Sequence, residues 1–133
     1  MSRKTVIRWV EGRQFVGTDD RGHSIVLSGD DSGGVRPSSM LLVAMAACSA
    51  VDVTSILEKQ RVELSRLEVE AEGEQDPDPP WTYRRIHLRY RIRGKGLTEK
   101  AVERAIRLSE NKYCSVAATV RGKAEILTEF LIE

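Results

Sequence analysis

The chain has 133 residues, of which 41% are hydrophobic and 31% are charged, with a formal net charge of +1. This balance is typical of a folded globular protein and argues against intrinsic disorder. The nearly neutral charge provides no overall field that would attract nucleic acid or an anionic membrane. The length predicts a single domain over residues 1–133, large enough to bury a core without disulfides or a metal.

The start of the sequence shows no targeting signal. Residues 1–12, MSRKTVIRWVEG, lack the long apolar stretch and the small-residue cleavage site of a secretory signal peptide. The longest apolar run, Met40 to Cys48, is too short to span a bilayer and predicts a core helix. We therefore expect a cytoplasmic protein with no membrane partner, in which thiols stay reduced unless they are redox-active.

The first third of the sequence predicts a three-stranded meander. Strands are expected over residues 4–10, 13–18 and 23–28, with turns at Glu11-Gly12 and Arg21-Gly22. A loop rich in glycine, aspartate and serine follows over residues 29–39. This loop ends in Ser38 and Ser39, either of which can cap the next helix.

A long helix is predicted from about Ser39 to about Gln60, and its first half is apolar on every face. A helix that is apolar all round must be surrounded by protein. Because a chain of this size can hardly enclose the helix alone, we expect a second copy to cover its remaining face. The simplest such arrangement is a symmetric homodimer.

Two alternating strands are predicted on either side of the proline-rich loop DPDPP. Leu67, Val69 and Ala71 alternate with Glu68, Glu70 and Glu72, and then Ile86, Leu88, Tyr90 and Ile92 alternate with Arg85, His87, Arg89, Arg91 and Arg93. An antiparallel hairpin sets the glutamate row opposite the arginine row, where each ion pair contributes about 0.2–1 kcal/mol. The charged face lacks the aromatic residues of a single-strand binder, so we expect no nucleic-acid partner.

The remaining elements complete an α+β protein. An amphipathic helix is predicted over residues 97–114 with Thr98 as its cap, and a closing strand over residues 124–133. The predicted order is β-β-β-α-β-β-α-β. The two cysteines form no CxxC motif, and the chain has only two histidines, His23 and His87. We therefore expect no metal site.

Cys48 and Cys114 each lie in a predicted helix, where a free cysteine is commonly a buried core residue. Two segments, however, resemble the signature regions of the OsmC/Ohr family, the osmotically inducible and organic hydroperoxide resistance proteins. They are RPSSMLLVAMAACSAVDVTSILEKQRVELSRLEVEAEGE and LSENKYCSVAATVRGKAEI. The stretch AACSAVDVTSILEKQR is most similar to the YhfA-like branch. The resemblance implies an OsmC-like fold over the whole chain, with a central apolar helix, in an intertwined homodimer with two interfacial sites.

The resemblance also implies thiol-dependent reduction of organic or hydrogen peroxides in oxidative-stress defence. In such a site Cys48 is the peroxidatic thiol, Cys114 is the resolving thiol, and an external dithiol restores both. The family uses no metal and no organic cofactor. Its peroxidases carry an arginine in the first hairpin region, for which Arg13 and Arg36 are the candidates. A glutamate at the start of the central helix orients that arginine in the family, whereas this sequence has Ser38 and Ser39 there.

Two alternatives to the peroxidase stay open. A non-enzymatic binding module would hold a small apolar or reactive molecule in the dimer cleft, with the cysteines as its lining. A thiol sensor would change a contact with a partner when it is oxidised. For Arg13 and Arg36, an ordinary solvated charge is the alternative to an activating role. Thiol reactivity discriminates the enzyme from the binding module.

Overall fold

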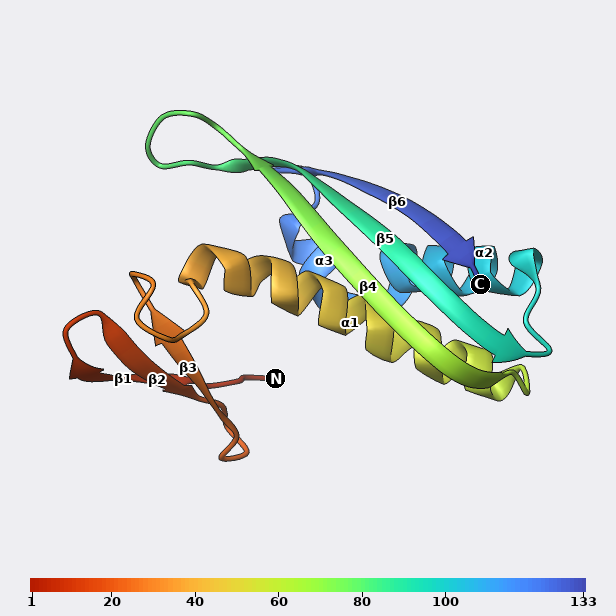
Figure 1. Cartoon of the computed structure of the whole chain (residues 1–133), viewed down its shortest axis with the longest axis horizontal. Coiled ribbons are helices and arrows are strands. Elements are labelled where there is room, and N and C mark those ends of the chain that lie inside the picture. Colours follow the sequence, from red (N-terminus) through yellow and green to blue (C-terminus); the bar gives the residue numbers. More distant parts are fainter. The chain divides into compact units, whose positions relative to one another are not determined.

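The computed structural model describes all 133 residues, whose contacts gather into two units, Met1–Leu41 and Leu42–Glu133. In the N-terminal unit, β1 (Val6–Glu11), β2 (Gln14–Thr18) and β3 (Ser24–Ser28) form an antiparallel sheet in that order (Figure 1). The predicted meander is confirmed. The turn between β1 and β2 contains Gly12 with a φ of 50°, a conformation that glycine adopts without steric cost. The single domain expected over residues 1–133 stays a prediction.

Helix α1 runs over Pro37–Lys59 and begins two residues before the predicted start. Pro37 occupies the first helical position, where its missing N–H and restricted φ are both tolerated. The Met40 N–H donates the first helical hydrogen bond to the Arg36 carbonyl at 2.8 Å. Ser38 and Ser39 therefore lie inside the first turn, and the prediction that a serine precedes the helix is wrong.

The C-terminal unit contains a three-stranded sheet in the order β4-β5-β6. Its strands are β4 (Glu63–Gln75), β5 (Tyr83–Lys95) and β6 (Glu125–Ile132). β4 and β5 are antiparallel, whereas β5 and β6 are parallel. A parallel pair needs a long crossover connection. Helix α2 (Glu99–Leu108), a π-helical segment η1 (Ser109–Tyr113) and helix α3 (Ser115–Val120) provide it.

The predicted second helix is divided at its C-terminal end. The Thr98 hydroxyl accepts a hydrogen bond from the Ala101 N–H at 3.1 Å, which confirms Thr98 as the cap of α2. The helix does not continue to Cys114, and that prediction is wrong. The chain widens into η1, where the Cys114 N–H bonds to the Ser109 carbonyl five residues earlier at 2.8 Å. Cys114 itself precedes α3 with an extended backbone.

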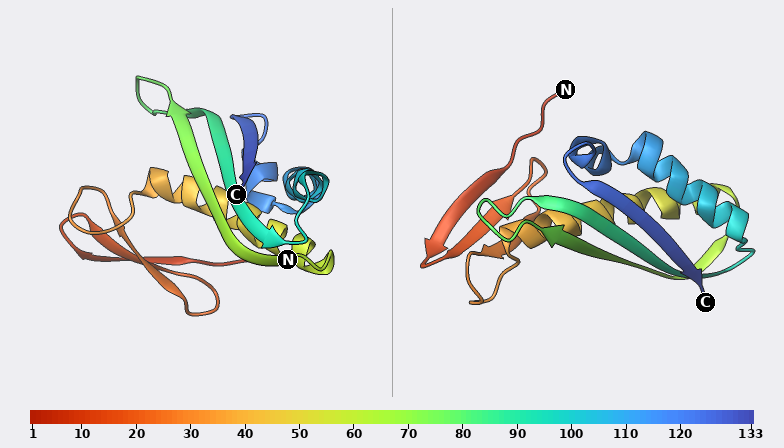
Figure 2. Two further views of the ribbon diagram at one scale, coloured as in Figure 1. Left: turned by 45° about the vertical axis from the view of Figure 1, so that its right-hand side comes forward. Right: turned by 90° about the horizontal axis from the view of Figure 1, so that it is seen from above.

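The three helices cover one face of the β4-β5-β6 sheet (Figures 1 and 2). The inward residues of β5 are buried, as their alternation predicted, and α1 contributes a stripe of buried residues at helical spacing. The main core residues are Met45, Val53, Leu57, Ile86, Leu88, Tyr90, Ile92, Val102, Ala105 and Ile106. The sheet and helices of this unit therefore form the two-layer arrangement expected of an α+β protein.

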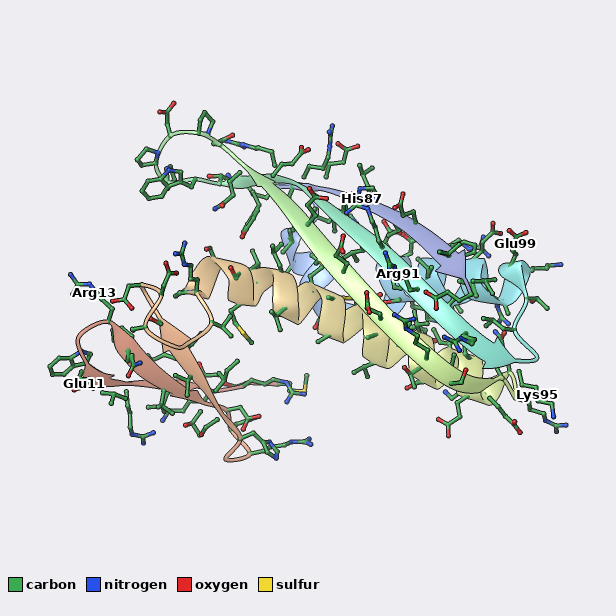
Figure 3. All side chains as sticks on the ribbon, in the orientation of Figure 1. Glu11, Arg13, His87, Arg91, Lys95 and Glu99 are labelled. Carbon is green, nitrogen blue, oxygen red and sulfur yellow. The ribbon has the colours of Figure 1, made fainter.

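The opposite face of the sheet is charged. Glu68 is paired with Arg91, Glu70 with Arg89 and Glu72 with His87. The prediction that the hairpin sets the glutamate row opposite the arginine row is therefore confirmed. The Arg89 guanidinium lies 2.8 Å from Glu70, 2.7 Å from Glu72 and 3.0 Å from Glu129 of β6. The hydrogen bonds that Arg89 donates to Glu72 and Glu70 raise the pKa of its guanidinium above the ordinary value. His87 and Arg91 belong to this same face (Figure 3). The absence of a nucleic-acid partner stays a prediction.

Helix α1 has a second apolar stripe that its own chain leaves exposed. Val43 is 47% exposed and Val51 is 65% exposed, whereas Met45 and Val53 are completely buried. By length and composition alone, the full helix is apolar enough to cross a membrane. The core helix of a soluble protein passes the same test. The helix is therefore apolar on a face that its own unit does not cover.

Candidate functional site

The two cysteines lie together in the C-terminal unit. The Sγ atoms of Cys48 and Cys114 and a carboxylate oxygen of Asp52 all lie within 4.8 Å of one another. Both cysteines are free thiols. Cys48 is half-buried on α1, and Cys114 is 3% exposed at the junction of η1 and α3. Folding thus brings the sulfur atoms of two cysteines that are far apart in the sequence into one site.

The environment of Cys114 favours its protonated form. Its Sγ atom accepts a hydrogen bond from the Ala117 N–H at 3.3 Å. Burial, together with a hydrogen bond to Cys48, nevertheless raises the pKa of the Cys114 thiol to about 11. At neutral pH Cys114 is therefore a protonated thiol.

Asp52 is the site residue that the sequence analysis missed. It follows Cys48 by one helical turn, and residues four apart are neighbours on a helix surface. The Ser109 hydroxyl of η1 donates a hydrogen bond to Oδ2 of Asp52 at 2.8 Å. The spacing of Cys48 and Asp52 on one helix was the signal that could have identified this carboxylate.

Three buried hydroxyl groups extend the site into the core. The Ser109 and Ser49 oxygens lie 3.3 Å apart, and those of Ser49 and Tyr90 lie 2.5 Å apart. Burial raises the pKa of Tyr90 to about 12, so its hydroxyl is neutral at physiological pH. No buried side-chain nitrogen or oxygen lacks a hydrogen-bond partner. The hydroxyls of Ser49 and Tyr90 therefore extend the hydrogen-bond chain that begins with Ser109 and Asp52, and they add no charge to the site.

The cavity beside these residues is small. It has a volume of about 10 Å³ and is lined by residues that include Met45, Tyr90, Ser109 and Cys114. A cavity of this size holds at most about one water molecule. The cavity therefore has no room for an organic molecule.

Arg13 and Arg36 belong to the N-terminal unit, where each lies near an aspartate of that unit. The exposed Arg36 guanidinium is 2.5 Å from Asp31. Arg13 lies in the turn between β1 and β2 (Figure 3). Hydrogen bonds from Ser32 and Ser28, with a smaller effect of the Arg13 charge, lower the pKa of Asp30. The assignment of either arginine to the activation of Cys48 stays a prediction.

Comparison with known proteins gives consistent matches over nearly the whole chain. Residues 29–129 match the family model described as OsmC-like protein. Protein YhfA of Escherichia coli K12 is 43% identical over 122 residues, which is 90% of each chain. A hypothetical protein from Aquifex aeolicus VF5 has a TM-score of 0.84 and 31% identity, over 100% of this chain and 98% of its own. The organic hydroperoxide resistance protein OhrB of Bacillus subtilis shares the fold, with a TM-score of 0.65 and 17% identity over 98% of both chains.

Proposed function

Because the chain belongs to the OsmC-like protein family, we propose that it reduces organic or hydrogen peroxides through Cys48 and Cys114. The observation that carries this proposal is the position of the two sulfur atoms, within 4.8 Å of each other on separate elements. OhrB, which has the same fold, is named for organic hydroperoxide resistance. The chemistry of each step follows from the residues of this chain.

Cys48 is the thiol that meets the peroxide, since it is half-buried whereas Cys114 is almost completely buried. The Cys48 thiolate attacks the outer oxygen of the peroxide, and the O–O bond breaks. The alkoxide leaves and takes a proton from water, so the peroxide is reduced to an alcohol. The sulfur loses two electrons and becomes a sulfenic acid.

Cys114 then resolves the sulfenic acid. Its sulfur attacks the Cys48 sulfur, the S–S bond forms and the S–OH bond breaks. The raised pKa of Cys114 means that a base has to take its proton during the attack. A carboxylate oxygen of Asp52 lies within 4.8 Å of both sulfur atoms. A side-chain rotation or one bridging water would bring it within reach of this proton, which it passes to the departing hydroxide, so that water leaves. An external dithiol reduces the disulfide and is itself oxidised.

The active protein is a homodimer in this proposal. The exposed stripe on α1 that contains Val43 and Val51 supports it, because contiguous exposed apolar surface marks an interaction site. A second copy is the simplest partner for such a surface, since closed twofold assemblies are the commonest oligomers. The cytoplasm, where an external dithiol is available, is the compartment that suits this chemistry.

The test is a stoichiometric hydroperoxide challenge of the reduced protein in the presence of a chelator. Intact-mass measurement should show the loss of two hydrogens per chain, and peptide mapping should identify a Cys48–Cys114 disulfide. Cys114→Ser should accumulate a sulfenic acid at Cys48 that dimedone traps. Cys48→Ser should leave Cys114 reduced. If both thiols of the folded protein stay reduced under excess peroxide, the peroxidase proposal fails and the binding module takes its place.

A further inference from the structure

We infer that Cys48, Asp52 and Cys114 of the reduced protein form a binding site for a zinc ion. Each of the three residues offers one ligand atom, and these atoms all lie within 4.8 Å of one another. Zinc binds cysteine sulfur at about 2.3 Å and carboxylate oxygen at about 2.0–2.2 Å in tetrahedral geometry. Ligand atoms around such an ion are about 3.5–3.8 Å apart, so small side-chain rotations bring the three into coordinating positions.

Two of the three ligand residues are already restrained by hydrogen bonds. The Ser109 hydroxyl donates to Oδ2 of Asp52 at 2.8 Å and leaves the other carboxylate oxygen available. The Ala117 N–H donates to the Cys114 sulfur at 3.3 Å. Hydrogen bonds of this outer kind orient metal ligands and contribute strongly to affinity. Three protein ligands leave the fourth position of the ion to water or to an added ligand.

The charge of the ligands points to a divalent cation. Cysteine binds a metal as the thiolate, so binding would release the thiol protons, and a divalent cation would neutralise the two thiolates and the carboxylate. The sequence analysis expected no metal site because it counted only cysteines and histidines as ligands. Asp52 supplies the third ligand instead, from the helical turn that follows Cys48.

Zinc binding goes beyond the proposed function, because it is an equilibrium property of the reduced thiols. It holds whether or not those thiols react with peroxide. Formation of the Cys48–Cys114 disulfide would remove both sulfur ligands, so zinc and oxidation should exclude each other. Bound zinc should accordingly slow the alkylation of Cys48, the more exposed of the two thiols, by iodoacetamide.

The experiment is a titration of the full-length, reduced, metal-free protein under inert gas. Calorimetry with Zn²⁺ should show saturable binding of one ion per chain. Co²⁺ should produce intense thiolate-to-metal charge-transfer bands, which disappear when zinc is added. Protein alkylated with iodoacetamide is a control that needs no mutation, and it should not bind.

Variants identify the ligands. Cys48→Ser and Cys114→Ser should each abolish the cobalt charge-transfer spectrum of a two-thiolate site, and Asp52→Asn should weaken zinc binding. Ser109→Ala, which removes only the outer hydrogen bond, should weaken binding by about 10- to 100-fold. Ser115→Ala is the matched control, because this exposed serine is the neighbour of Cys114 and should leave the affinity unchanged. Absence of saturable binding, or an affinity that both cysteine variants retain, would overturn the inference. An unchanged affinity in Asp52→Asn would overturn the three-ligand set.

Discussion

The Ser109 hydroxyl donates a hydrogen bond to Oδ2 of Asp52 at 2.8 Å, across 57 positions of the sequence. This bond connects the π-helical segment η1 to α1 and holds the carboxylate beside both cysteines. The geometry of helix α1 positions Asp52 one turn after Cys48. The π-helical hydrogen bond from Cys114 to Ser109 positions Ser109. The hydrogen bond between Ser109 and Asp52 therefore joins two segments that are distant in the sequence, η1 and α1, in one site.

Asp52→Asn should slow the resolving step of the proposed reaction and spare the first step. The amide keeps the size of the carboxylate but cannot accept the Cys114 proton, so disulfide formation should slow by about 10²-fold, at the lower end of general-base effects. Rapid-quench mass spectrometry after one equivalent of peroxide, with chelator present, should show sulfenic acid accumulating at Cys48. Glu58→Gln, an exposed acid on the same helix, is the control. Equal rates in all three proteins would remove Asp52 from the mechanism.

Tyr90→Phe should destabilise the protein although it preserves the aromatic ring in the core. Tyr90 is 2% exposed, and its hydroxyl bonds to that of Ser49 at 2.5 Å. Removing one partner of a buried hydrogen bond costs about 1–3 kcal/mol, which urea unfolding should measure. Tyr113→Phe is the matched control, because Tyr113 is 53% exposed. Its effect should stay within about 0.5 kcal/mol. The same loss in both variants would contradict the importance of the buried hydroxyls.

The free energy of unfolding should fall at alkaline pH because of Cys114. Folding raises the pKa of this thiol from 9.0 to about 11, so the unfolded chain gives up its proton first. The stabilisation from the protonated thiol is complete below pH 9 and is lost as the pH rises toward 11. Urea midpoints in reductant and chelator should decline over this window.

Cys114→Ala should flatten this decline and leave the contribution of Tyr90, whose raised pKa of about 12 places its effect at higher pH. Matching slopes for the original protein and Cys114→Ala between pH 9 and 11 would show that the thiol does not ionise as its burial requires.

Val51→Asp should dissociate the proposed homodimer without unfolding the chain. Val51 is 65% exposed on α1, so a carboxylate there is hydrated in the monomer and buried only when a second copy covers it. Sedimentation at micromolar concentration should give twice the 14.9 kDa chain mass for the original protein and the chain mass for the variant. Met45→Asp should instead unfold the protein, because Met45 is completely buried. A monomeric original protein would refute the dimer.

Much of the fold follows from local patterns in the sequence. The alternation of Ile86, Leu88 and Tyr90 with charged residues predicted β5 and its buried face, because successive strand residues point to opposite sides. Thr98 was identified as a helix cap from its hydroxyl and its position before an amphipathic repeat. The end of the second helix was predicted wrongly, because the π-helical turn at Ser109–Tyr113 adds a residue that no periodicity marks.

The sequence by itself determined the strands, the apolar central helix and the family, and it identified Cys48 and Cys114 as the candidate site residues. These features depend on residue type and short-range spacing. Only the tertiary structure decided that Cys114 meets Cys48 and Asp52, and that Ser109 orients the carboxylate. The crossover from β5 to β6 brings the η1–α3 junction back to the face of the sheet that α1 covers. Contacts of this kind depend on how whole elements pack, because the energy that selects them is the burial of the core that they share.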